Sequence, residues 1–145
     1  MSQIKTKLQE QLKDAMRARA QHTLLTLRSL SAAIKQFEVD SRTEADDERV
    51  VAIVQKEIKM RRDALSFAES QNRAELIEQN KAEIALLQGF LGDQLSEDEL
   101  KSIIQKLVAE GADSIGKIMG ALNKDYKGKF EGKVASELIK QSLGS

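Results

Sequence analysis

Cysteine and proline are both absent from this chain of 145 residues, and only five of its residues are aromatic. Without cysteine the chain can form neither a disulfide framework nor a thiolate metal site or nucleophile. No window approaches the length of about eighteen apolar residues that a membrane span requires. The N-terminal sequence MSQIKTKLQEQL lacks the apolar stretch of a signal peptide. These absences predict a protein of the reduced cytoplasm that has no membrane partner.

Glycine is also absent from residues 1–88, which argues for long helices joined by polar turns. Apolar residues recur at helical spacing, and no segment alternates polar and apolar residues over the length of a strand. We therefore expect an all-α fold. Glycines at positions 89 and 92 divide it into a bundle of about four helices, residues 1–92, and a smaller three-helix domain, residues 93–145. The predicted helices cover roughly residues 3–19, 22–39, 45–70 and 73–88, then residues from the Ser96–Glu99 capping box to Gly111, residues 116–123, and the segment after Gly132.

The segment Ser114–Lys133 differs from the rest of the chain because it is rich in both glycine and lysine. Glycine costs a helix about 1 kcal/mol relative to alanine, so we expect a structural reason for it. The spacing predicts a closely packed helix at Gly116–Asn123, followed by a basic loop at Lys124–Glu131. The structural glycines are Gly116, Gly120, Gly128 and Gly132, and the candidate phosphate contacts are Lys117, Lys124, Lys127, Lys129 and Lys133.

The charge of the chain sums to zero, so its total gives no sign of a polyanionic partner. Residues 1–40 and 114–145 each carry a net charge of +3, whereas the residues between them are acidic. Lysine supplies point charge for phosphates and no bidentate reading of bases. The few aromatic residues count against a stacking platform for single strands, but a folded RNA recognised by its phosphates fits this composition. A lysine-rich loop exposed to solvent, with no ligand, remains the alternative.

No catalytic, metal or cofactor site is expected from the sequence. Gly111–Lys117 has the spacing of a phosphate-binding P-loop, but Ile118 follows it and has no hydroxyl for Mg²⁺. His22 is the only histidine, so neither a histidine metal site nor a catalytic triad can form. We expect His22 to cap or solvate a turn, and Glu57 to pair with Arg61 one helical turn later.

Several motifs resemble the YqeY family of small bacterial cytosolic proteins. They are Phe90–Leu100 (FLGDQLSEDEL), Gly116–Leu122 (GKIMGAL), Lys127–Lys129 (KGK) and Gly132–Val134 (GKV), and Met16–Arg19 and Lys59–Leu65 also look like that family. The sequence departs from the family pattern at Gly92, where proline is usual, and at residues 123–125.

The C-terminal part of this family is similar to the tail domain of GatB, a subunit of the glutamine-dependent tRNA amidotransferase. The resemblance implies a tRNA-binding accessory module, with tRNA, an amidotransferase or other translation-related proteins as partners. Because the sequence shows no catalytic constellation, we expect this module not to be catalytic on its own. Two alternatives stay open. One is a protein-interaction adaptor without RNA contact, and the other is a part in glutamine-dependent amide transfer, a carbon–nitrogen ligase activity with glutamine as amido donor.

Overall fold

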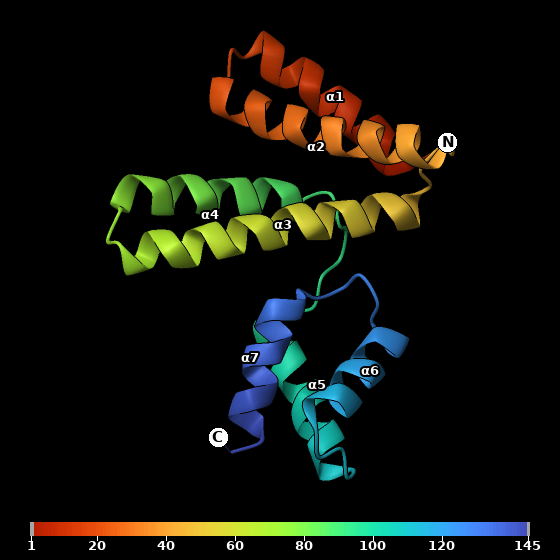
Figure 1. Ribbon diagram of the computed structural model, residues 1–145, viewed down its shortest axis with the longest axis vertical. Helices are drawn as coiled ribbons and strands as arrows, with labels where there is room; N and C mark the ends of the chain where they lie inside the picture. The colour runs from red at the N-terminus through yellow and green to blue at the C-terminus, as the bar shows by residue number, and fades with distance from the viewer. Residues whose placement is uncertain (1, 145) are drawn as a thin grey trace. The chain divides into compact units, whose positions relative to one another are not determined.

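The computed structural model describes residues 2–144, and these fold into helices without any strand, as Figure 1 shows. The all-α prediction is therefore confirmed. The chain forms two compact units, Met1–Gly92 and Asp93–Ser145, and each has its own hydrophobic core. The helices are α1 (Gln3–Arg17), α2 (Gln21–Ser41), α3 (Asp47–Ser70), α4 (Ala74–Gln88), α5 (Glu97–Ala109), α6 (Ile115–Asp125) and α7 (Gly132–Ser142). No helix within the described part is both long and apolar enough to cross a bilayer.

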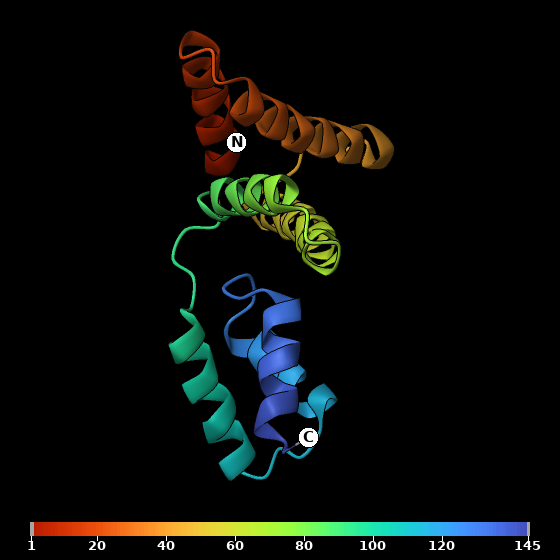
Figure 2. The ribbon, with the colours of Figure 1, turned by 90° about the vertical axis from the view of Figure 1, so that its left-hand side faces the viewer.

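The first unit consists of two helical hairpins, α1 with α2 and α3 with α4, and the second pair lies side by side in Figures 1 and 2. Arg19 and Asn72 adopt positive φ angles of 55° and 54° where the chain reverses between the helices of each pair. The core is aliphatic, and each buried side chain of this size contributes about 1.5–3 kcal/mol. Its most deeply buried members are Leu27, Leu30, Val50, Val54 and Leu87.

A polar network crosses the first unit between α2, α3 and α4. Arg61 donates from Nη1 to Glu57 Oε1 over 3.3 Å and from Nε to Glu83 Oε1 over 3.0 Å, and both carboxylates are largely buried. The predicted pairing of Glu57 with Arg61 is thus confirmed. His22 was expected to cap or solvate a turn, but its Nε2 lies 3.4 Å from Glu83 Oε2. Ser29 Oγ adds a hydrogen bond to Glu57 over 3.2 Å, so the network joins three helices.

The second unit packs α5, α6 and α7 around a small core. The capping box at Ser96–Glu99 is confirmed, since Ser96 Oγ accepts from the Glu99 backbone N–H and the Glu99 carboxylate accepts from that of Ser96. The hydrogen bond from Ser96 lowers the pKa of the Glu99 carboxyl. The core consists of Leu100, Ile104, Ile118, Leu122, Phe130, Ala135, Leu138 and Ile139.

Two expectations for the glycine-rich segment are wrong. The helix α6 runs on to Asp125, so Lys124 lies in its last turn and not in the loop. The close packing expected at Gly116 and Gly120 is absent, because a Cβ built on either residue meets nothing within 4 Å. A Cβ built on Gly132, the first residue of α7, also meets nothing within 4 Å. Helix α6 packs instead through Ile118 and Leu122, so its glycines lie on the solvent side.

Candidate nucleic-acid interface

The exposed face of α6 carries two lysines with a glycine between them. Lys117 and Lys124 are seven residues apart and Gly120 lies between them, which places all three on one side of the helix. The two lysines are separated by about 10 Å along the helix axis. All three residues are exposed, and Gly120 leaves the helix backbone uncovered between the two cations. Ser114 caps the N-terminus of the helix by accepting a hydrogen bond from the backbone N–H of Lys117.

The turn between α6 and α7 is held in a defined shape. Its Gly128 adopts a φ of 80°, which a residue with a side chain rarely tolerates, so this predicted structural glycine has a conformational reason. The Lys129 N–H donates to the Tyr126 carbonyl over 2.9 Å. From the start of the unit, Gln94 Nε2 donates to the Gly128 carbonyl and the Leu95 N–H to the Lys129 carbonyl, each over 2.8 Å. Hydrogen bonds thus hold the turn to the C-terminal end of α6 and to the segment before α5.

The five candidate lysines differ in their surroundings. Lys117 Nζ lies 3.0 Å from Asp113 Oδ1, and this hydrogen bond lowers the pKa of the Asp113 carboxyl. Both side chains of that pair are exposed, so it contributes little stability and can open for a ligand. Lys124 and Lys129 are exposed, and neither has an acidic partner within residues 2–144. Lys127 is exposed in the turn, whereas Lys133 is half-buried in the first turn of α7.

The structure therefore brings four of the five lysines onto α6 and the adjoining turn, with Lys133 beside them at the start of α7. The residues that sequence reasoning missed are Gln94 and Leu95, which fix the turn through hydrogen bonds. These contacts span 34 residues, and no local pattern signals them. Ammonium groups in this arrangement can bind phosphates electrostatically. No group of three histidine or carboxylate side chains within residues 2–144 is placed to hold a metal ion.

Comparison with known proteins gives this chain two relatives, of which one aligns with nearly its whole length. A protein named "Altered inheritance of mitochondria protein 41, mitochondrial" from Pyrenophora tritici-repentis (strain Pt-1C-BFP) is 26% identical over 145 residues, which cover 96% of this chain and 80% of the relative. The protein of the same name from Lachancea thermotolerans (strain ATCC 56472 / CBS 6340 / NRRL Y-8284) is 30% identical over 106 residues, covering 71% of this chain and 57% of the relative. The profile of the Yqey-like protein family matches residues 5–143, so the chain belongs to that family.

Proposed function

We propose that the second unit binds tRNA as an accessory module, with α6 and the α6–α7 turn as its contact surface and without catalysing a reaction itself. The observation that carries the proposal is the exposure of Lys124 and Lys129, which have no acidic partner in the described chain. An unpaired ammonium group gains free energy when it neutralises a phosphate and releases the bound counterion. The resemblance to the GatB tail supports tRNA as the polyanion.

The exposed glycines support the same surface. A bulky side chain at position 120 would keep a ligand away from the α6 backbone between Lys117 and Lys124. Because Gly120 leaves that space open, a phosphate backbone can lie against the helix and reach both ammonium groups. Contacts of this kind read charge and shape, so the proposed binding has little dependence on base sequence.

The salt dependence of tRNA binding tests the proposal. The quadruple variant Lys117→Gln/Lys124→Gln/Lys127→Gln/Lys129→Gln removes the charges but keeps side-chain length. The plot of log K against log salt has a negative slope, and each lost phosphate contact makes it less steep by about 0.7–0.9, so the loss of four contacts reduces its magnitude by about 3. Filter binding of labelled tRNA between about 50 and 200 mM salt measures both the affinity and the slope.

The matched control is Lys101→Gln/Lys106→Gln, which removes two exposed charges from α5 in the same unit. It should change the slope by less than about 0.9, which is the effect of one phosphate contact. If the quadruple variant has the wild-type affinity and slope, the proposed surface is wrong. Circular dichroism of both variants checks that the helices are intact.

We place this function in the cytoplasm, which the lack of cysteine and the resemblance to bacterial cytosolic proteins support. The relatives described above carry the word mitochondrial in their names, so fractionation of cells with the tagged protein is the direct test.

Amide transfer has a separate assay with glutamine, ATP and misacylated tRNA. We expect no amidated product, because these residues carry no glycine- and serine-rich amidase signature, and the P-loop-like Gly111–Lys117 is followed by Ile118, which has no hydroxyl for Mg²⁺.

A further inference from the structure

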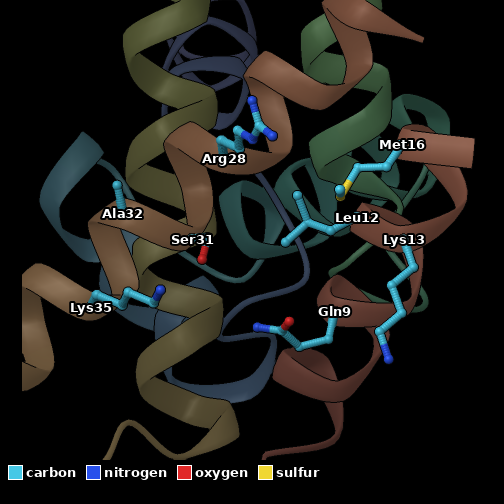
Figure 3. Close-up of a pocket in the computed structure, with 8 residues that line it drawn as sticks. All are labelled: Gln9, Leu12, Lys13, Met16, Arg28, Ser31, Ala32 and Lys35. Carbon is cyan, nitrogen blue, oxygen red and sulfur yellow. The ribbon is translucent and has the colours of Figure 1, made fainter. Parts of the chain in front are cut away.

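A groove with a volume of about 580 Å³ lies between α1 and α2 in the first unit, and Figure 3 shows the side chains that line it. Each helix contributes four residues at positions i, i+3, i+4 and i+7, which form one continuous face two turns long. The groove is therefore about 10 Å long. The lining residues are Gln9, Leu12, Lys13 and Met16 from α1, and Arg28, Ser31, Ala32 and Lys35 from α2.

The floor of the groove is apolar and exposed. Leu12 is half-buried, and Met16 keeps 57% of its surface accessible. Figure 3 shows both side chains pointing into the space between the helices. Methionine is unbranched and flexible, so it adapts to apolar side chains of different shapes. No aromatic side chain lines the groove, so it offers no stacking platform for a nucleobase.

Three cations line the same groove, and no acid does. Lys13, Arg28 and Lys35 are all exposed, and none has an ion pair with a carboxylate elsewhere in residues 2–144. Other cations of this unit do have such partners. For example, Lys5 Nζ lies 2.6 Å from Glu38 Oε2. The groove therefore combines an apolar floor with three uncompensated positive charges.

We propose that this groove docks an acidic amphipathic helix of a partner protein. Apolar residues of that helix, spaced at i, i+3 or i+4 and i+7, fill the floor, and its flanking carboxylates meet the three cations. Phosphates of an RNA would meet the cations but leave Leu12 and Met16 uncovered. A second copy of this chain would bring the same positive face against itself, because a two-fold contact is self-complementary. The inference is independent of the proposed tRNA binding.

Selection from a peptide library tests this inference. Helical peptides of about 15 residues, displayed on phage, are selected on the full chain in solution. We expect the enriched peptides to be acidic and to carry apolar residues at helical spacing. Fluorescence anisotropy then measures the affinity of the best labelled peptide. The variant Lys13→Gln/Arg28→Gln/Lys35→Gln should bind it about tenfold more weakly, since each exposed ion pair contributes about 0.5 kcal/mol. Met16→Ser should also weaken binding, without changing the salt dependence.

The control variant Lys56→Gln/Lys59→Gln/Lys81→Gln removes three exposed charges from α3 and α4 and should bind the peptide like the wild type. Four outcomes overturn the inference: no enrichment, enrichment of neutral or basic peptides, equal peptide affinity of the groove and control variants, or loss of tRNA affinity in the groove variant with peptide binding intact. Sedimentation of the wild type and of the groove variant tests self-association, and a dimer of the wild type that the groove substitutions dissociate would also overturn the inference.

Discussion

Replacement of Gly120 by alanine should stabilise the second unit. Gly120 is the sixth residue of α6 (Ile115–Asp125), where glycine is less favourable than alanine by about 1 kcal/mol. A Cβ at this position meets nothing within 4 Å, so the gain is not offset by a clash. Substitutions of this kind, made where the backbone is compatible, stabilise by about 0.4–1 kcal/mol through the unfolded chain. We expect a gain in the free energy of unfolding at the upper end of this range.

The single tyrosine makes the measurement specific to this unit. Tyr126 follows α6 directly, packs against the core of the second unit, and is the only tyrosine in a chain without tryptophan. Its fluorescence during urea unfolding therefore reports the second unit alone. With a slope of about 1 kcal/mol/M, a gain of about 0.8 kcal/mol raises the urea midpoint by about 0.8 M.

Gly128→Ala is the control, and it should change the urea midpoint in the opposite direction. At a φ of 80° a side chain is strained, so the same chemical change should lower the midpoint, with a cost of about 1–2 kcal/mol. A wild-type or lower midpoint for Gly120→Ala would refute the reasoning, because it would mean that the side of α6 taken as open is occupied in solution.

Three further predictions concern other contacts. Arg61→Met leaves the buried Glu57 carboxylate without a counter-charge, with only the Ser29 hydroxyl as partner, so urea unfolding followed by circular dichroism should show a loss of about 3 kcal/mol. Ser96→Ala removes the hydroxyl that caps α5 and should cost the second unit about 1 kcal/mol by Tyr126 fluorescence. The Ser2 hydroxyl lowers the pKa of Asp47, so this carboxylate stabilises above the unfolded pKa of about 3.9. Its contribution is lost as pH falls through the folded pKa, and the stability difference between wild type and Asp47→Asn should vanish in acid.

Features that depend on nearby residues could be predicted from the sequence. The helical spacing and the Ser96–Glu99 capping box predicted the helices and the start of α5, because both depend on side chains within one or two turns. The pair of Glu57 and Arg61 was predictable for the same reason. The bond from Arg61 to Glu83 was not, since it joins residues 22 apart that only the packing of α3 against α4 brings together.

The orientation of a helix could not be predicted either. The spacing of Gly116 and Gly120 suits close packing as well as it suits an open surface, and the sequence does not say which side of α6 meets α5 and α7. In the structure both glycines lie on the open surface, because α6 packs through Ile118 and Leu122 on its other side. The candidate lysines could be named from the sequence, unlike the packed side of α6, because a cluster of lysines and glycines is visible in the sequence itself.

The open side of α6 also links stability to the proposed function. If Gly120 contributes nothing to packing, its cost to the helix is uncompensated within the second unit. A ligand that approaches the α6 backbone would supply the compensation, as stability is often given up where a binding surface requires it. Gly120→Ala should then raise the urea midpoint and weaken tRNA binding together, whereas Lys101→Gln/Lys106→Gln should do neither. A variant that is more stable and binds tRNA as tightly as the wild type would separate the glycine from the proposed RNA surface and leave the lysines as its only support.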